Sequence, residues 1–212
     1  MIRKILIADD HVAVREGLVR ILSHEYPQAE CRVAEDPAQV HQFIAEDVFD
    51  LLILDLSLPG RGGLDVMKQV KDLSPATAIL VYTVHPDEEF GLRALRAGAD
   101  GYVTKDRPVE DLLKAIVRVS EGKRYISEAL AQRMANMVLN PTSALPHESL
   151  SDRELQILQM LGSGLTPSVI ASRLNLSIKT VSTYRTRLLG KLDLHTTGEL
   201  IRYAIENKIS TL

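Results

Sequence analysis

Five polar side chains in the first half of the chain could together perform phosphoryl chemistry. Three are the carboxylates of Asp9, Asp10 and Asp55, and the other two are the hydroxyl of Thr83 and the amine of Lys105. Asp55 directly follows the apolar run Leu-Leu-Ile-Leu, where a charge is costly to bury without a partner. Carboxylate oxygens suit a hard divalent cation such as Mg²⁺, while a hydroxyl and an amine suit phosphoryl oxygens. Asp55 could therefore act as a nucleophile that forms an aspartyl phosphate.

The fold that must position these side chains is predicted by apolar runs that alternate with amphipathic stretches over residues 1–122. Helical periodicity is clear at 12–24 and at 109–121. Strands that alternate with helices favour βαβ units, so we expect a five-stranded parallel, doubly wound α/β domain of the flavodoxin type. The predicted strands are Lys4–Ala8, Glu30–Ala34, Leu51–Leu54, Ile79–Thr83 and Gly101–Val103.

All five polar residues fall at the carboxyl ends of these strands, where such sheets bind their ligands. The flavodoxin-like strand order makes the first and third strands neighbours, so the three carboxylates should converge. Mg²⁺ would relieve their mutual repulsion, and Lys105 would contact the phosphoryl oxygens. Taken singly, an Asp at a strand end is usually a helix N-cap, as Asp10 could be, and a lone Lys is usually solvated. The combination of all five favours a phosphoacceptor site.

The sequence pattern changes after residue 122. We expect a linker over 123–148, with a helix that starts near Ser127 and a proline-containing stretch, "NPTSALPHES". Four helices fit in 151–207, which predicts a second, all-α domain over 149–212.

A helix-turn-helix motif is predicted within this second domain, at "TPSVIASRLNLSIKTVSTYRTRLLGKL". Thr166 and Ser177 are good N-caps for two successive helices, and Asn175 between them tolerates the left-handed conformation of a tight turn.

One face of the second helix in this motif is polar and suits DNA. Small polar side chains let a helix enter the major groove and touch base edges, while basic side chains hold phosphates. Residues 149–212 carry a net charge of +3 and residues 1–148 carry −6, which agrees with an anionic partner for the C-terminal part. The alternative is an ordinary solvated helix face. The residues expected to contact DNA are Lys179, Ser182, Thr183, Tyr184, Arg185, Thr186, Arg187 and Lys191.

Several motifs identify the family that the chain resembles. "IADDH", "LLILDLSLPGRGGLD", "VYTVHPDEE" and "RALRAGADGYVTK" make residues 1–122 resemble a bacterial receiver domain with the CheY-like fold. "LSDRELQILQMLGSGLT" and "LNLSIKTVSTYRTRLLGKLDL" make residues 149–212 resemble the LuxR-type DNA-binding domain. The whole chain thus resembles a NarL/FixJ-family two-component response regulator, and "KTVSTYR" is most similar to the GacA/UvrY branch.

This resemblance implies roles for individual residues. It implies Asp55 as the phosphoacceptor, assisted by Thr83 and Lys105, and Mg²⁺ held by Asp9, Asp10, Asp55 and the Ser57 carbonyl. It also implies Thr83 and Tyr102 as a switch pair, in which Tyr102 turns inward behind Thr83; the alternative is that Tyr102 is simply a packed aromatic at the strand edge. Val84 is bulkier than the Ala often found at this position, so we expect slower access of water to the phosphoryl group.

The function expected is that of a response regulator that is not an enzyme. A sensor histidine kinase would phosphorylate Asp55, and the chain would then form a homodimer that binds double-stranded DNA and regulates transcription. One rival is a haloacid-dehalogenase-like phosphatase, but such enzymes need a carboxylate where this chain has Ser57. The other rival is a regulator that works without phosphorylation.

The expected location is the cytoplasm, without a membrane partner. No apolar run approaches the roughly 20 residues that span a bilayer, and the apolar start of the chain is too short for a signal peptide. The single cysteine, Cys31, excludes an internal disulfide and is expected to be a packed thiol.

Overall fold

A computed structural model describes residues 2–59, 62–139, 145–207 and 209. The chain divides into two compact units, Met1–Ala135 and Asn136–Leu212, and each is described by itself. Among the described residues, none of the helices has the length and apolar character needed to cross a membrane.

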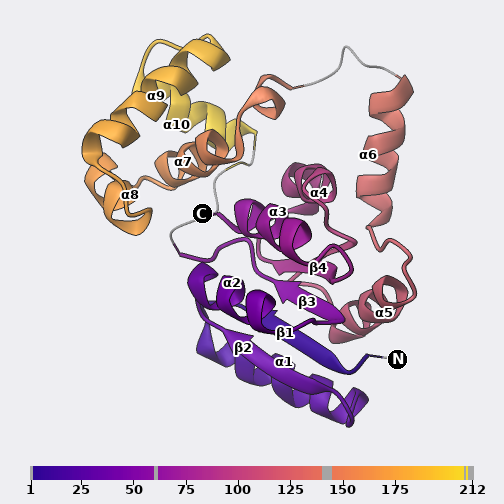
Figure 1. The fold of residues 1–212 in the computed structure, drawn as a ribbon. Helices are drawn as coiled ribbons and strands as arrows, with labels where there is room; N and C mark the ends of the chain where they lie inside the picture. The colour runs from indigo at the N-terminus through magenta and orange to yellow at the C-terminus, as the bar shows by residue number, and fades with distance from the viewer. Residues whose placement is uncertain (1, 60–61, 140–144, 208, 210–212) are drawn as a thin grey trace. The chain divides into compact units, whose positions relative to one another are not determined.

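The first unit is built on a five-stranded parallel sheet in the order β2-β1-β3-β4-β5 (Figure 1). This confirms the predicted doubly wound fold and its strand order. The strands are β1 (Lys4–Ala8), β2 (Glu30–Ala34), β3 (Leu51–Leu54), β4 (Ala78–Thr83) and β5 (Gly101–Thr104). The first three match their predicted bounds, while β4 begins one residue earlier and β5 ends one residue later than predicted.

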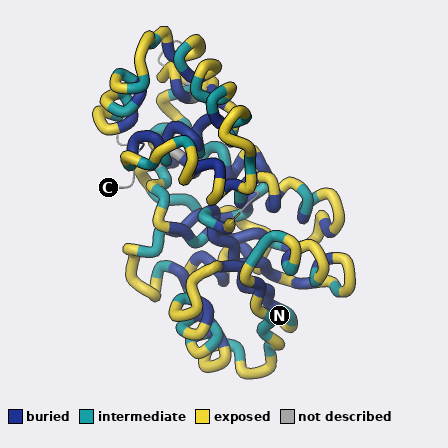
Figure 2. The backbone as a smooth tube through the Cα atoms, turned by 90° about the vertical axis from the view of Figure 1, so that its left-hand side faces the viewer, coloured by how far each residue is buried: buried dark blue, intermediate teal, exposed yellow. Residues whose placement is uncertain are grey.

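Helices cover both faces of this sheet (Figure 1). They are α1 (Val12–Glu25), α2 (Pro37–Glu46), α3 (Gly63–Leu73), α4 (Asp87–Arg96) and α5 (Val109–Ser120). Leu18 and Leu22 of α1 share one core cluster with Leu112 and Ile116 of α5, so these two helices pack on the same face. Helices α2, α3 and α4 lie on the other face. Most residues of β1, β3, β4 and β5 are buried, whereas only Ala34 of the edge strand β2 is, and exposed residues follow the outer sides of the helices (Figure 2).

The segment that follows α5 packs onto the edge of the sheet. The amide of Tyr102 donates to the carbonyl of Tyr125 at 2.9 Å, so this segment lengthens the edge of β5. Helix α6 (Glu128–Leu139) then begins, and the hydroxyl of Ser127 accepts from the Leu130 amide at 3.0 Å, as a predicted N-cap should. The Leu130 side chain is fully buried, and a Cβ on Gly91 of α4 would lie 2.5 Å from it. Residues 123–135 of the predicted linker are therefore part of the first compact unit.

The second unit holds the four helices that the sequence predicts. After a short 3₁₀ helix (Pro146–Ser149) come α7 (Asp152–Gly162), α8 (Pro167–Arg173), α9 (Ile178–Leu192) and α10 (Thr197–Glu206). The hydroxyls of Thr166 and Ser177 cap α8 and α9 by accepting backbone N–H bonds. Asn175 has φ of 51°, which is the left-handed conformation predicted for the tight turn between these helices.

Candidate functional site: an acidic pocket and a polar helix face

The ends of β1 and β3 bring two carboxylates together. Ala8 and Leu54 are paired in register, so Asp9 and Asp55 each follow the last paired residue of neighbouring strands. The Nζ atom of Lys105, just beyond β5, donates to Asp9 Oδ2 at 2.6 Å and to Asp55 Oδ2 at 2.7 Å. Asp9 and Asp55 are buried, with side chains only 2% and 1% exposed. Three residues that are far apart in sequence thus form one buried ionic cluster.

Asp55 stays ionised in this cluster because its partners outweigh its burial. Burial by itself would raise the pKa of the Asp55 carboxyl group. The charge of Lys105 and hydrogen bonds from Lys105, Thr83 and the Ser57 amide act in the opposite direction, and the net pKa is lowered. Lys105 shows the complementary effect: burial lowers its pKa, but its two carboxylate partners raise it above the ordinary value. A carboxylate kept charged and desolvated is suited to act as a nucleophile.

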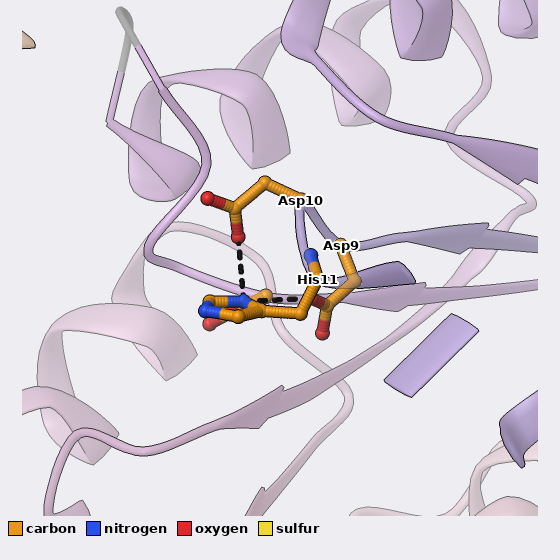
Figure 3. Close-up of side chains that lie close together, drawn as sticks. Asp9, Asp10 and His11 are labelled. Carbon is orange, nitrogen blue, oxygen red and sulfur yellow. Dashed lines mark hydrogen bonds and ion pairs between the residues drawn. The ribbon is translucent and has the colours of Figure 1, made fainter. Parts of the chain in front are cut away.

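Asp10 is exposed, unlike Asp9, and its carboxylate contacts His11 (Figure 3). His11 Nδ1 is 2.8 Å from Asp10 Oδ1, and the His11 amide donates to Asp9 Oδ1 at 2.8 Å. The alternative in which Asp10 caps α1 is wrong, because His11 occupies the N-cap position and no side chain caps it. Sequence reasoning gave His11 no role, although its place directly after two aspartates was a usable signal.

The pocket has the donor set of a divalent cation site. One ligand atom each from Asp9, Asp10, His11 and Asp55 lie within 4.8 Å of one another. Carboxylate oxygens are the ligands that Mg²⁺ prefers, and it commonly uses one or two of them with water and phosphate oxygens. Ser57 is held beside the cluster by its amide, which donates to Asp55 Oδ1 at 3.0 Å. The residues present therefore fit Mg²⁺ chemistry.

Thr83 and Tyr102 are linked through a residue that sequence reasoning missed, His85. Thr83 is fully buried at the end of β4, and its hydroxyl accepts from the His85 amide at 3.5 Å. Tyr102 is turned inward, 2% exposed, and its hydroxyl donates to the His85 carbonyl at 2.9 Å. The His85 ring lies 4.7 Å from the ring of Phe90, and its Nε2 is 3.3 Å from the Ser57 hydroxyl.

The charge state of His85 follows from this setting. Burial lowers the pKa of its imidazole, Lys105 lowers it further, and the Asp55 carboxylate opposes them only in part. The ring is therefore biased towards its neutral form. The sequence carried no spacing signal for this residue, because its hydrogen-bond partners far away in sequence lie on the loop after β3 and on β5.

All eight residues predicted to contact DNA lie on α9. Lys179, Thr183, Thr186 and Arg187 are exposed, whereas Ser182, Tyr184 and Arg185 are partly buried. The two threonine hydroxyls donate to backbone carbonyls one turn earlier in the helix, at 3.0 and 3.1 Å. Arg187 extends over the ring of Tyr184, with 5.7 Å between the guanidinium carbon and the ring centre.

Lys191 is placed differently from the other expected DNA contacts. Its Nζ donates to Glu154 Oε2 at 2.7 Å, and the Glu154 side chain is buried in α7. Burial would raise the pKa of Glu154, but the bonds from Lys191 and Ser151 outweigh it and lower the pKa. Ser151 and Glu154 also form the reciprocal capping box that starts α7. Lys191 thus already has a structural partner.

Comparisons with known proteins agree with this division into two parts. The family described as "Response regulator receiver domain" matches residues 5–117, and "Bacterial regulatory proteins, luxR family" matches residues 148–204. The oxygen regulatory protein NreC of Staphylococcus haemolyticus is 37% identical over 213 residues, which cover 97% of this chain and 98% of that protein. NreC of Staphylococcus epidermidis is 36% identical over 214 residues, with the same two coverages.

Solved structures of response regulators are also similar to this chain. RcsB of Salmonella enterica serovar Typhimurium, bound to the promoter rprA in the presence of phosphomimetic BeF₃⁻, has a TM-score of 0.68 and 25% identity, covering 96% of this chain and 98% of that one. A LuxR-family two-component response regulator from Aurantimonas has a TM-score of 0.60 and 33% identity, covering 66% of this chain and 100% of that one.

The fold and the acidic pocket define a receiver domain, and the second unit is a LuxR-type helix-turn-helix domain. The chain is therefore a two-component response regulator, a class of DNA-binding transcription regulator. More particularly, it belongs to the NarL/FixJ family of these regulators.

Proposed function

We propose that Asp55 is the residue that accepts the phosphoryl group, from a sensor histidine kinase. The observation that carries this proposal is the buried cluster in which Lys105 bridges Asp55 and Asp9. An Asp55 oxygen would form a bond to phosphorus while the bond from phosphorus to the donor's histidine nitrogen breaks, and the imidazole leaves after taking a proton. Lys105 and the Thr83 hydroxyl are placed to contact the oxygens of the transferred group.

Asp9, Asp10, Asp55 and the Ser57 carbonyl are proposed to hold Mg²⁺. When bound, the cation would neutralise the crowded carboxylates and the charge of the transferred phosphoryl group. Support comes from the oxygen-rich donor set within 4.8 Å. His11, which contacts Asp9 and Asp10, would orient these two residues.

The consequence of phosphorylation is proposed to reach the second domain through Thr83 and Tyr102. A Thr83 hydroxyl drawn to the phosphoryl group would release its bond from the His85 amide, and the His85 carbonyl is the acceptor for the Tyr102 hydroxyl. The chain would then form a homodimer and place the α9 face on double-stranded DNA. In this proposal residues 1–122 receive the signal, 123–148 transmit it and 149–212 bind DNA in the cytoplasm.

Turnover of phosphate esters is not part of the proposal. A phosphatase that uses an Asp nucleophile needs a second carboxylate two residues later as general acid, and Ser57 stands there. Its hydroxyl faces His85 Nε2 at 3.3 Å, and neither group replaces that carboxylic acid in this proposal. Hydrolysis of a chromogenic phosphate ester by the chain would contradict this view.

The test is phosphorylation of the full chain by acetyl phosphate and Mg²⁺, followed by intact-mass measurement. The unaltered chain and an Asp72→Asn variant, changed at an exposed position of α3, should both gain one phosphoryl group. Asp55→Asn should gain none. A phosphoryl group on Asp55→Asn, or none on the unaltered chain, would overturn the proposal.

A second experiment addresses the output. Genome-wide mapping of DNA sites with the unaltered chain and with Asp55→Asn should show a loss of occupancy in the variant. Equal occupancy would favour the rival in which the protein regulates transcription without phosphorylation.

A further inference from the structure

We infer that Arg15 is a positioning residue for the acidic pocket, one that fixes the backbone of Asp9 so that its carboxylate is held ready for Mg²⁺. This inference rests on the proposed role of Asp9 as a metal ligand. Arg15 lies in the first turns of α1 and is 6% exposed, which is rare for an arginine unless it is paired. A buried guanidinium group needs hydrogen-bond partners to offset its desolvation.

The partners of Arg15 show what it holds. Nη1 donates to the backbone carbonyl of Asp9 at 2.7 Å, and Nη2 donates to Glu35 Oε1 at 2.6 Å. Asp9 follows β1 and Glu35 follows β2, so the guanidinium group ties together the carboxyl ends of two neighbouring strands. The planar fork of arginine suits this two-directional contact, whereas a lysine amine lacks its fixed geometry.

The bond to the Asp9 carbonyl leaves the Asp9 carboxylate available. Arg15 therefore orients this residue without competing with a cation for its side-chain oxygens. The contact of Lys105 with Asp9 Oδ2 does compete, and Lys105 is expected to turn to a phosphoryl oxygen during the reaction. Asp9 would then be held by Arg15, by the His11 amide on Oδ1 and by its own amide, which donates to Ala34 at 3.1 Å.

The ion pair with Glu35 helps to distinguish two possible roles of Arg15, positioning of Asp9 and neutralisation of the acidic pocket. The Glu35 carboxylate pairs with Nη2, whereas Asp9 accepts from Nη1, so the positive charge of Arg15 already has a counter-ion. If Arg15 served only as a positive charge that offsets the acidic pocket, its removal would make the pocket more negative and Mg²⁺ would bind more tightly. If it positions Asp9, its removal weakens Mg²⁺ binding. The two roles predict opposite signs.

The experiment measures the rate of phosphorylation of the full chain by acetyl phosphate as a function of Mg²⁺ concentration. Arg15→Met removes the charge and both bonds, and Arg15→Lys keeps the charge but not the fork. Both variants should raise the Mg²⁺ concentration for half-maximal rate by about 10-fold, the usual effect of losing a residue that orients a metal ligand. The maximal rate at saturating Mg²⁺ should stay close to that of the unaltered chain.

Lys71→Met is the matched control. Lys71 makes the same kind of contact, with the Thr77 carbonyl at 2.8 Å and Asp100 Oδ2 at 2.9 Å. Thr77 and Asp100 lie just before β4 and β5, at the amino ends of the strands, whereas the acidic pocket lies at their carboxyl ends. This variant should lose thermal stability without a change in its Mg²⁺ dependence. If Arg15→Met does not fold, Arg15→Lys carries the test.

The outcomes are distinct. The positioning role would be overturned if the Mg²⁺ concentration for half-maximal rate fell in Arg15→Met or stayed unchanged in Arg15→Lys. The proposed function would stand in either case. A chain with unaltered sequence whose phosphorylation does not depend on Mg²⁺ would overturn the proposed metal site and, with it, this inference.

Discussion

The acidic pocket of the receiver domain and the polar face of α9 are both built from charged and hydroxyl side chains, yet they are organised in opposite ways. The pocket gathers Asp9, Asp55 and Lys105 from three separate strand ends and buries them as ion pairs. The α9 face takes its residues from one continuous helix and leaves most of them exposed. Covalent chemistry needs groups fixed before the reaction, whereas a DNA-binding face needs side chains that can adjust to a groove.

The largest expected effect comes from removing the positive charge of the pocket. Lys105→Met leaves Asp9 and Asp55 buried without their shared counter-ion, so the free energy of unfolding at pH 7 should fall by about 3 kcal/mol. Chemical denaturation of the full chain without Mg²⁺ measures it. Addition of Mg²⁺ should restore part of the loss, because the cation replaces the missing charge.

The pH dependence of this loss has a definite sign. The pKa of Asp55 is lowered by folding, so its stabilising contribution is present above the unfolded pKa of about 4 and is lost as the pH falls through the folded value. The pKa of Lys105 is raised, so its contribution is present below the unfolded value of about 10.5 and is lost as the pH rises through the folded value. The difference in unfolding free energy between the unaltered chain and Lys105→Met should therefore shrink below about pH 4. A difference that grows in acid would contradict the assignment.

A smaller effect is expected from Lys191 on α9, which, like Lys105 in the pocket, pairs with a buried carboxylate. Lys191→Met removes the partner of Glu154, and the unfolding free energy of the second domain should fall by about 1 kcal/mol, since Lys191 is partly solvated. Thermal unfolding of the full chain measures this loss. Arg187→Ala, changed at an exposed position of the same helix, is the control and should leave stability nearly unchanged. Equal stability of Lys191→Met and Arg187→Ala would show that the Lys191–Glu154 ion pair does not stabilise the second domain.

The same Arg187→Ala variant should change DNA binding instead. The loss of one phosphate contact should weaken binding to all sequences similarly and reduce the slope of log affinity against log salt by about 1. Fluorescence anisotropy with duplex DNA over a salt series provides the measurement. An unchanged slope would show that the Arg187 side chain stays over Tyr184 and does not reach a phosphate.

The smallest expected effect concerns water at the pocket. Val84 directly follows Thr83 and is exposed, so Val84→Ala should open the approach to a phosphoryl group on Asp55. The rate of dephosphorylation should rise modestly, without a change in stability. Decay of the phosphorylated chain, followed by intact mass, measures this rate, and an unchanged rate would contradict a shielding role.

The sequence was sufficient to predict the strands and the position of Asp55 at the end of β3, because both depend on local signals repeated in a fixed order. Where strands alternate with helices, an apolar run such as Leu51–Leu54 favours a buried parallel strand, and the polar residue that follows it then lies where the strands end. The caps at Ser127, Thr166 and Ser177 were predictable for the same reason, since each acts within one turn of its own helix.

Other parts of the site could not be read from the sequence. The Asp9–Arg15 contact joins a strand end to a helix, and His85 acquires its role from Ser57 and Tyr102, which lie on other strands and loops. The burial of Leu130 against Gly91, within a segment predicted to be a linker, is of the same kind.

By itself, the sequence determined the order of strands and helices, the five polar residues of the pocket and the polar face of α9, because hydrophobic periodicity and capping act over a few residues. Only the tertiary structure decided which cation neutralises which carboxylate. In the structure, Lys105 pairs with Asp9 and Asp55, Arg15 pairs with Glu35, and Lys191 pairs with Glu154. Such pairs join residues 20 to 96 positions apart, and their strength depends on burial and distance, which no local pattern specifies.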